Sequence, residues 1–585
     1  METFENIVGT LGDLVWSSGI PVGDETIPFV VIALLGTGIF LTLRMGFVQL
    51  RRFAHGVAVT TGRYDDPNEP GDVSHFQALT TALSATVGIG NIAGVALAIH
   101  WGGPGALFWM WVTAFLGMAV KFTEVTLAQH YRDVGPDYDP KRWEGSVSGG
   151  PMYYIERGLG RNWKWMAVLF AGLLGTTAFL TGNANQANTV ADQMNATFGV
   201  PDTVTGIVTS AIVFAVIIGG IRRIGRVTAI LAPLMAAIYV LGALVVILLN
   251  APEIVPSFQL IFTEAFNPTS GVAGTGAGAF LLTLMWGVRR GLFSNESGQG
   301  SAPIAHAAAK TDEPVSEGVV ALLEPFIDTL VVCTMTGLVI ITTGVWDDAV
   351  PTEITLDGGD LSYRAETVDG GFAEIDPPAE IEFIDGQPAE TGPDAPLVAW
   401  HEAPVDGLYI DAELTQPFTG VVQALDGIAT DEGGLTYTSL HGNAVESGAP
   451  LTALGFQRGL PGQWGNFIVL LAVLLFAIST AIAWSYYGDR CANYLFGTKA
   501  ILPYKYVFVA IHFVGATLPL QAVWDLGDVF LGMVIIPNLI ALLLLSGKVV
   551  DLTKSYFERE PWHENYEVHK RIIEERRRRK EEAPR

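Results

Sequence analysis

A hydrophobic stretch between residues 71 and 132 most constrains what this chain can fold into, because a cluster of helix breakers interrupts it. Apolar residues flank Gly88-Ile89-Gly90-Asn91 on both sides, over a length that could cross a bilayer. In hydrocarbon, backbone N–H and C=O groups released from a helix find no partners, so non-helical backbone at that depth must be buried in protein or line a cavity. The stretch therefore predicts a broken helix whose gap faces an internal site.

Composition independently indicates a protein that crosses a membrane many times. Of 585 residues, 50% are hydrophobic and only 16% are charged, and the mean hydropathy is +0.38. The sequence contains no nucleophile–base pair or metal-ligand constellation, so we expect neither an enzyme nor a bound cofactor. Five consecutive basic residues, 576–580, are interpreted as part of a solvated helix near anionic lipid headgroups, and no basic recognition surface for nucleic acid occurs elsewhere.

Eleven apolar stretches have lengths suited to a bilayer. They centre on 26–46, 76–100, 104–131, 163–182, 204–220, 227–250, 272–290, 318–345, 465–489, 504–522 and 526–547. If alternate loops face the cytoplasm, 30 of the 33 Lys and Arg residues lie inside and two lie outside. The positive-inside rule then predicts a multi-pass protein of the cell membrane with its N-terminus outside and its C-terminus in the cytoplasm. The first 25 residues contain no Lys or Arg and do not resemble a secretory signal.

A strongly acidic segment separates the eighth and ninth stretches. Between Asp347 and Pro450 there are 22 acidic residues and one basic residue, Arg364, so this segment carries −21 of the chain's net charge of −26. Short alternating runs such as Glu380 to Ile384, followed by turn residues, predict a small β-rich domain outside the cytoplasm. Its acidity fits a surface adapted to high salt, and a role in capturing cations near the entrance is the alternative.

Several motifs are similar to those of one transporter family. They are GDVSHFQALTTALSATVGIGNIAGVALAIHWGGPG from residue 71, GGPMYYIERGLG at 149–160, TGNANQANTVAD at 181–192, GLFSNESGQGSAPIAHAAAK at 291–310 and STAIAWSYYGDR at 479–490. Together they resemble the alanine or glycine:cation symporter family, also called the sodium:alanine symporters, over about 71–548 apart from the acidic segment. The resemblance implies an all-α membrane protein of eleven transmembrane helices.

The fold that this resemblance implies is of the LeuT type, with a peripheral first helix followed by two inverted repeats of five. Its expected divisions are 1–70 (N-terminus, peripheral helix and linker), 71–250 (first repeat), 251–345 (start of the second), 346–456 (insert), 457–550 (rest of the second) and 551–585 (cytoplasmic tail). The seventh helix, which begins the second repeat, should also be broken. We place that break at Trp286-Gly287, with Gly274 to Gly278 as the competing position.

A zwitterionic amino acid needs an electropositive and an electronegative partner in a dry site. N–H groups near Gly88, Gly90 and Asn91 can supply the first, and carbonyl groups near Ala85, Thr86 and Val87 the second. Glycines that merely allow close helix packing are the alternative. The resemblance adds further expected substrate-binding residues, with the two aromatic side chains limiting substrate size: Phe179, Gln186, Trp286 and Gly287.

The resemblance also implies a sodium site between the first break and the ninth apolar stretch. Its expected oxygen ligands are neutral, as suits a monovalent hard cation: Ser84, Val87, Phe476, Ser479 and Thr480. A Ser-Thr pair in an apolar helix can instead be bonded back to the preceding turn. Elsewhere, Lys121 and Glu124 are three residues apart in one apolar stretch, and we expect them to form an ion pair.

The sequence as a whole predicts a secondary symporter that imports small neutral amino acids, alanine or glycine, with sodium by alternating access. Its expected partners are the amino acid, the sodium ion and the lipid bilayer. A proton-coupled transporter and an amino-acid sensor that uses the acidic insert are the alternatives. A channel is disfavoured because no filter motif or ring-forming acidic repeat occurs.

Overall fold

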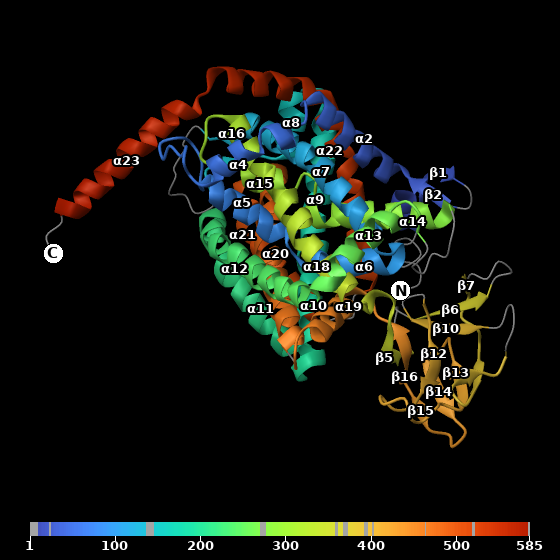
Figure 1. Ribbon diagram of the computed structural model, residues 1–585. Coiled ribbons are helices and arrows are strands. Elements are labelled where there is room, and N and C mark those ends of the chain that lie inside the picture. Colours follow the sequence, from blue (N-terminus) through green and yellow to red (C-terminus); the bar gives the residue numbers. More distant parts are fainter. Residues whose placement is uncertain are drawn as a thin grey trace.

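The computed structural model describes residues 10–22, 25–135, 145–268, 277–356, 361–366, 372–390, 396–400, 403–462, 464–517 and 521–582. Most of them form one body of packed helices, with a group of strands beside it and a helical arm extending from the end opposite those strands (Figure 1). The long helices are α2 (Phe29–Arg44), α5 (His75–Thr86), α6 (Ala93–Gly102), α7 (Ala106–His130), α9 (Lys164–Phe179), α10 (Asn185–Phe198), α11 (Asp202–Ile217), α12 (Gly220–Leu249), α14 (Ala277–Asn295), α20 (Trp464–Phe496), α21 (Ile501–Thr517), α22 (Gln521–Arg559) and α23 (Trp562–Glu582).

Shorter helices complete the body. They are α3 (Val48–Arg51), α4 (Phe53–Thr60), α8 (Pro151–Gly158), α13 (Ile254–Glu264), α15 (Ala302–His306), α16 (Pro314–Ala321), α17 (Leu323–Pro325), α18 (Thr334–Thr342) and α19 (Gly448–Gly459). Two π-helical turns, Leu180–Ala184 and Phe326–Cys333, join α9 to α10 and α17 to α18.

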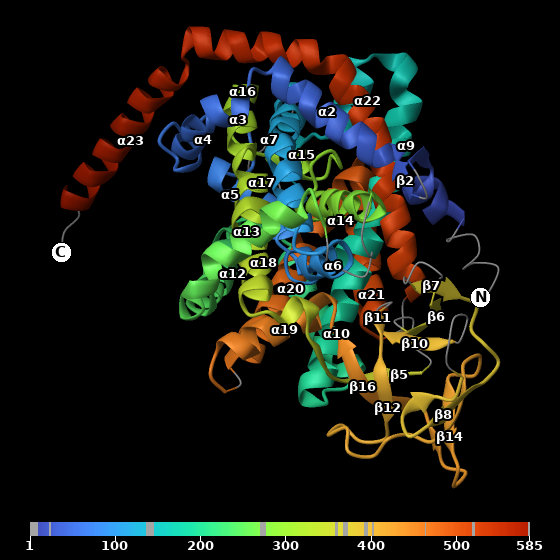
Figure 2. The same cartoon turned by 45° about the vertical axis from the view of Figure 1, so that its right-hand side comes forward.

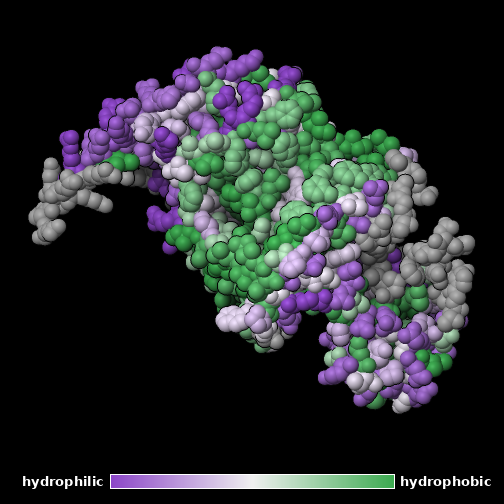
Figure 3. Space-filling model, viewed as in Figure 1, coloured by the Kyte–Doolittle hydropathy of each residue, from purple (hydrophilic) through white to green (hydrophobic). Residues whose placement is uncertain are grey.

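Many of these helices can cross a membrane. Among the described residues, seven helical runs are long and apolar enough to do so, and eight if the bent pair α5 and α6 is one span. Two shorter apolar helices, α2 and α11, and the glycine-rich α14 occupy the remaining predicted positions. The protein is therefore a polytopic, mostly helical membrane protein, whereas the number of eleven spans stays a prediction. Figure 3 shows the broad apolar surface that such a protein turns to lipid.

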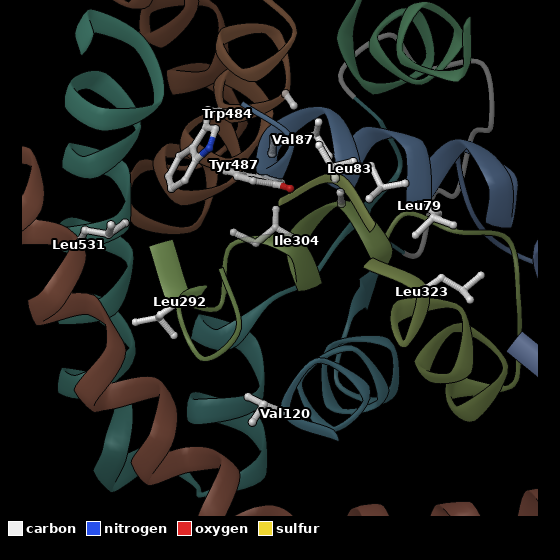
Figure 4. Packing of buried hydrophobic residues seen from close by; sticks show 14 of the residues in the cluster. Leu79, Leu83, Val87, Val120, Leu292, Ile304, Leu323, Trp484, Tyr487 and Leu531 are labelled. Carbon is white, nitrogen blue, oxygen red and sulfur yellow. The ribbon is translucent and has the colours of Figure 1, made fainter. Parts of the chain in front are cut away.

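The first predicted break is present. Helix α5 starts with a capping box, in which Ser74 and Gln77 each bond the other's backbone N–H at 3.2 and 3.1 Å. It ends at Thr86, and a short 3-10 turn, Ile89–Asn91, leads into α6 after a bend of 64°. Leu79 and Leu83 of α5 point towards the segments that carry Ile304 and Leu323, so the broken helix is packed inside the body (Figure 4).

The second break is not where we predicted it. Helix α14 is continuous from Ala277 to Asn295 and passes through Trp286 and Gly287 without interruption. A Cβ atom on Gly287 would lie 2.4 Å from the Ala106 carbonyl oxygen, so this glycine allows α14 to pack against α7. Of the competing position, 274–276 lie outside the described residues, and 277–278 are the first residues of α14.

The chain leaves the helix instead at Glu296–Ser301. Glu296, Gly298 and Gly300 have φ angles of +54°, +91° and +77°, which a right-handed helix cannot contain. Helix α15 follows after this turn.

Strands are concentrated between α18 and α19. They are β5 (Ala349–Thr355), β6 (Leu361–Glu366), β7 (Phe372–Ile375), β8 (Ile381–Ile384), β9 (Gln387–Pro388), β10 (Leu397–Trp400), β11 (Ala403–Pro404), β12 (Asp406–Tyr409), β13 (Gly420–Gln423), β14 (Ile428–Asp431), β15 (Thr436–Tyr437) and β16 (Ser439–Val445). They form antiparallel sheets in the orders β12-β16-β5, β15-β14-β13-β8-β9 and β11-β10-β6-β7. Phe383, Phe418 and Leu440 belong to a hydrophobic core of their own, separate from that of the helices. Two short hairpins lie elsewhere, β1 (Gly19–Val22) with β2 (Glu25–Pro28) and β3 (Asp133–Val134) with β4 (Val147–Ser148).

The arm consists of the end of α22 and all of α23, and it crosses the surface near α4 (Figure 2). Aromatic contacts fasten it there. The rings of His55 and Trp562 are 4.6 Å apart, and His55 Nε2 lies 2.9 Å from the Tyr556 hydroxyl. The arm is thus docked on α4, in the segment between α2 and α5, by both apolar and polar contacts.

Candidate functional site

The gap between α5 and α6 opens into a small cavity, here called the break cavity. Its volume is about 30 Å³, room for a water or two. Its wall combines the two interruptions described above with the π-helical turn after α9, and with α10, α14, α20 and α22. The lining residues are Ala85, Thr86, Gly88, Ile89, Gly90, Thr181, Gln186, Phe293, Glu296, Gln299, Thr480, Trp484 and Leu531.

Three polar side chains on this wall have unused hydrogen-bonding capacity. Among the described residues, the Thr181 hydroxyl, Gln186 Oε1 and Gln299 Oε1 are buried with no partner. The amide nitrogens of the two glutamines are already committed, donating to the carbonyls of Thr181 and Leu292 at 3.1 and 3.4 Å. Because a buried polar group without a partner costs free energy, their common position on one cavity suggests a polar ligand.

Glu296 contributes the only carboxyl group among the lining residues. It is buried, with 4% of its surface exposed, and its Oε1 accepts a hydrogen bond from the indole N–H of Trp484 at 3.2 Å. Ser301 donates to its other oxygen. The left-handed backbone at Glu296 places this acid at the cavity rather than along the α14 helix.

Two residues of the other interruption, Ile89 and Gly90, line the same cavity. Ile89 and Gly90 begin the 3-10 turn, where N–H groups have no partner within the helix. Gly88 differs from our expectation, because its N–H already donates to Asn91 Oδ1 at 2.8 Å. Asn91 itself does not line the cavity, so its side chain caps the break and does not face a ligand there.

The buried carboxyl group of Asp328 holds the Asn91 side chain in place. Asn91 Nδ2 donates to Asp328 Oδ1 at 2.6 Å, and the hydroxyls of Ser294 and Thr329 donate to Asp328 Oδ2 at 2.6 and 2.8 Å. The Asn91 carbonyl accepts from Thr336 at 2.7 Å. This network ties the turn after the break to α14 and to the π-helical turn Phe326–Cys333.

Oxygen atoms gather where α20 crosses the end of α5. The Ser479 hydroxyl lies 3.4 Å from the Ser84 carbonyl and 2.9 Å from that of Phe476, and the Thr480 hydroxyl lies 3.2 Å from the Ser84 carbonyl. Four of the five predicted cation ligands are therefore close together. The Thr480 hydroxyl also lies 3.3 Å from the carbonyl of Ala85, a residue we had placed at the substrate.

Val87, the fifth predicted ligand, directly follows α5, and in the described chain no hydrogen bond joins its carbonyl to Ser479 or Thr480. The buried Ser84 hydroxyl has no hydrogen-bond partner among the described residues and adds one more oxygen. In the described chain no group of three or more His, Cys, Asp or Glu is arranged for a metal. A cluster of neutral oxygens suits a monovalent hard cation better than a transition metal.

The remaining predicted residues lie away from the break cavity. The Phe179 ring packs on Tyr504 at 4.7 Å, and Trp286 stacks on Trp101 at 5.6 Å. Gly287 is in the contact between α14 and α7. Five of the nine predicted substrate residues line the cavity: Ala85, Thr86, Gly88, Gly90 and Gln186.

Sequence reasoning missed Glu296, Gln299, Thr181 and Trp484 as cavity residues. The first two belong to the motif SNESGQG, where two glycines beside polar residues in an apolar context carried the same signal as the first break. Trp484 had no such signal. Its position follows from packing, since a Cβ atom on Gly182 would lie 2.5 Å from its Cγ.

The expected ion pair between Lys121 and Glu124 does not form. Lys121 Nζ lies 2.8 Å from Glu324 Oε1, and both side chains are inaccessible to solvent. Glu124 instead accepts from Asn538 Nδ2 at 2.5 Å. Each side chain on α7 finds a partner on a different neighbouring helix, because i and i+3 positions share a face but diverge towards separate neighbours.

Two interrupted helices around a small cavity with polar side chains on its wall, beside a cluster of neutral oxygens, are the organisation of a secondary transporter. The family model described as the sodium:alanine symporter family matches residues 1–366 and 408–570. The chain belongs to this family, whose members are transporters and not enzymes.

Relatives match almost the whole chain. A protein named sodium/alanine symporter AgcS from Methanococcus maripaludis is 39% identical over 558 residues, which cover 95% of this chain and 98% of that protein. Two Bacillus subtilis proteins are similar over nearly as much. One, named putative sodium/proton-dependent alanine carrier protein YrbD, is 32% identical over 94% of this chain and 92% of its own length, and the other, named probable sodium/glutamine symporter GlnT, is 30% identical over 95% and 91%.

Proposed function

We propose that this protein imports a small neutral amino acid, alanine or glycine first, together with Na⁺ by alternating access. The observation that carries the proposal is the break cavity, where unpartnered polar side chains, one carboxyl group and the first residues of the 3-10 turn line a space of about 30 Å³. Because this volume has room for only a water or two, the walls move apart when the substrate binds, and a small substrate keeps that movement small. The names of the relatives support alanine and sodium.

The two charges of the amino acid have separate partners in this proposal. The substrate carboxylate accepts hydrogen bonds from the N–H groups of Ile89 and Gly90, at the electropositive start of the turn. The substrate ammonium group donates to Glu296 and to the free amide oxygens of Gln186 and Gln299. Glu296 thereby replaces the carbonyls of Ala85 and Thr86 as the main electronegative group.

Sodium binds beside the substrate, among the oxygens of Ser84, Phe476, Ser479 and Thr480. The hydroxyl hydrogens of Ser479 and Thr480 turn away so that their lone pairs face the ion. Because the ion joins α20 to the last turn of α5, it orders the break that the substrate contacts. Linkage then requires sodium to raise substrate affinity and substrate to raise sodium affinity equally.

The membrane arrangement is part of the same proposal. Eleven spans place the N-terminus outside and the C-terminus inside the cell membrane, as the distribution of Lys and Arg favours. The spans after the first form two LeuT-type repeats, each starting with an interrupted helix, and the strand-rich region 346–456 lies outside the cytoplasm. The interruptions after Thr86 and after Asn295 support the repeat relationship.

Uptake of labelled alanine into proteoliposomes tests the proposal. An inward Na⁺ gradient should drive accumulation that excess unlabelled alanine or glycine abolishes, while a K⁺ gradient should not. Thr480→Ala should raise the Na⁺ concentration for half-maximal uptake roughly tenfold, since one oxygen contact is lost. Ser485→Ala is the matched control, because it removes a buried hydroxyl of α20 whose one hydrogen bond among the described residues is to the Ile482 carbonyl of its own helix. Uptake that ignores Na⁺ would refute sodium coupling.

A proton-coupled variant has one structural observation in its favour. A buried row of ionisable side chains connects α7 to α5, in which Lys121 pairs with Glu324, His306 lies 3.5 Å from Glu324 and 2.5 Å from Glu317, and His75 contacts Glu317. Such residues within a membrane mark ion and proton pathways. Accumulation of alanine driven by a proton gradient in Na⁺-free buffer would select this variant.

A further inference from the structure

A second cavity, of about 270 Å³, lies between the end of α2 and the last turns of α22. It shares no lining residue with the break cavity. Four cationic side chains line it: Arg44, Arg51, Arg52 and Lys554. None of its lining residues is acidic. Val48, Val550 and Phe557 supply apolar wall between the cations. We call it the basic cavity.

The four cations of the basic cavity are not neutralised by the protein. In the described part of the chain none of them forms an ion pair. Arg51 Nη1 donates only to the Gly46 carbonyl at 3.3 Å, and the Arg52 guanidinium lies 3.5 Å from the centre of the Phe557 ring. Four like charges around one hollow repel one another, so an anion bound there would lower the free energy.

A tight turn builds this convergence. Gly46 and Phe47 have φ angles of +62° and +55°, and the Phe47 N–H donates to the Thr42 carbonyl at 2.9 Å. The chain therefore folds back after Arg44, which brings Arg51 to the same cavity as the end of α2. The positive-inside rule explains basic residues after a span, but it does not explain why four of them surround one cavity.

The surroundings of the basic cavity are those of lipid. Leu43 on α2, Leu50 on α3 and Leu544 on α22 expose 61%, 68% and 57% of their surface. Figure 3 shows that the apolar surface gives way to hydrophilic residues towards the end of the body that carries α23. A free phosphate ion would satisfy the charges but leave these leucines in water, whereas an amphiphile would satisfy both.

We propose that the basic cavity binds the headgroup of an anionic phospholipid, with its phosphate on Arg51 and Arg52 and its acyl chains along Leu43 and Leu50. A guanidinium group presents paired N–H donors that match two phosphate oxygens. Basic pockets between membrane helices on the cytoplasmic side suit such headgroups.

A lipid bound in the basic cavity also affects the contacts that dock the arm. Phe557, which stacks on Arg52, also has its ring 5.6 Å from His55 and 5.6 Å from Trp562, within the contacts that dock the arm. A bound lipid fixes Arg52 and Phe557 together, so anionic lipid also slows undocking of α23.

The test measures lipid bound to the purified full-length protein. Detergent-solubilised protein is titrated with phosphatidylglycerol or phosphatidylcholine, and bound molecules are counted by native mass spectrometry. We expect phosphatidylglycerol to bind roughly tenfold or more tightly than phosphatidylcholine, and Arg51→Gln/Arg52→Gln to remove that preference. The matched control is Lys570→Gln/Arg571→Gln, which deletes two positive charges from α23 outside the cavity and should bind as the wild type does.

Other outcomes would overturn the proposal. Equal affinity for the two lipids, or equal weakening by the control pair, would show that no such site exists. Displacement of phosphatidylglycerol by inorganic phosphate at comparable concentration would assign the cavity to the free ion. Lys554→Gln is a second variant that keeps the test valid if the double variant does not fold, because Lys554 is exposed and forms no hydrogen bond or ion pair with the described residues. Unchanged preference for phosphatidylglycerol in this variant would count against the proposal.

Discussion

At the scale of single residues, position 88 has room for a hydrogen atom only. A Cβ atom on Gly88 would lie 2.8 Å from the Thr480 hydroxyl oxygen, closer than real Cβ contacts come. We expect Gly88→Ala to push α20 from the end of α5 and to lower Na⁺-driven alanine uptake at least roughly tenfold, since the oxygen cluster depends on that approach.

Gly94→Ala is the matched control, because the same methyl group there meets nothing nearer than 3.9 Å. Size-exclusion profiles of both variants check that each protein is folded. If Gly88→Ala transports as well as Gly94→Ala, the close approach of α5 and α20 is not required for coupling.

Glu296 is the second residue on which binding should depend. Glu296→Gln keeps the side-chain shape and an oxygen for the Trp484 indole N–H, but it removes the negative charge offered to the ammonium group. Charge-assisted hydrogen bonds are about twice as strong as neutral ones, so we expect alanine affinity to fall roughly tenfold in calorimetric titration with Na⁺ present. Glu124→Gln, which changes a buried carboxyl group outside the cavity, should leave alanine affinity unchanged. The same affinity in both variants would remove Glu296 from the site.

At the scale of elements, the sequence located one interruption and misplaced the other. Gly88 and Gly90 stand beside Asn91 in an otherwise apolar stretch, and together with the family resemblance this pattern favoured a break over close packing. In α14 the glycines have a second use, since Gly287 and Gly291 let that helix approach Ala106 and Met110 of α7. Glycine spacing cannot distinguish close packing from a break, and only the adjacent polar run Glu296 to Ser301 marks the true one.

Partners between elements were the least predictable part of the site. Hydrophobic length alone placed an apolar stretch over most long helices of the body, because spanning requires it, but it left α10 between two predicted stretches. Whether Lys121 pairs with Glu124 or with Glu324 depends on how α7 is rotated against α17. Asn91 caps the break because Asp328 accepts a hydrogen bond from its side chain. Such contacts are long-range and leave no periodic signal in one sequence.

The hydrogen bonds that Asp328 accepts near the break yield a prediction for the turn after α5. Both oxygens of Asp328 accept hydrogen bonds, from Asn91, Ser294 and Thr329, so Asp328→Asn must turn an NH₂ group towards at least one donor. We expect the turn after α5 to loosen, with faster hydrogen exchange at residues 88–93 and alanine uptake reduced roughly tenfold. Asp551→Asn on exposed α22 should change neither quantity. Unchanged exchange at the break in Asp328→Asn would show that Asp328 does not position it.

At the scale of the whole molecule, the strand-rich region is attached to a family core. The family model omits residues 367–407, inside the region we predicted as an insert at 346–456, and the strands there have their own hydrophobic core. Twenty-two acidic residues between 347 and 450 repel one another around that small core, which fits an environment rich in salt because screening weakens the repulsion. The helices contribute little to the net charge, so transport and surface charge reside in different parts of the chain.

The docked arm should respond to pH through Glu69. Burial raises the pKa of Glu69 to about 7, with Asp312 adding to the rise and the Asn565 hydrogen bond at 3.2 Å opposing it. When α23 undocks, Glu69 meets water and regains its ordinary pKa, so the docked state binds more protons between about pH 5 and pH 7. Docking is therefore strongest below that window and weakens as the pH rises through it. In the wild type, hydrogen exchange of α23, corrected for intrinsic rates, should be slower at about pH 5 than at about pH 7. This difference should vanish in Glu69→Gln. It should persist in the control Glu574→Gln, which lies on the exposed face of α23. A pH response that survives in Glu69→Gln would assign the effect to another group.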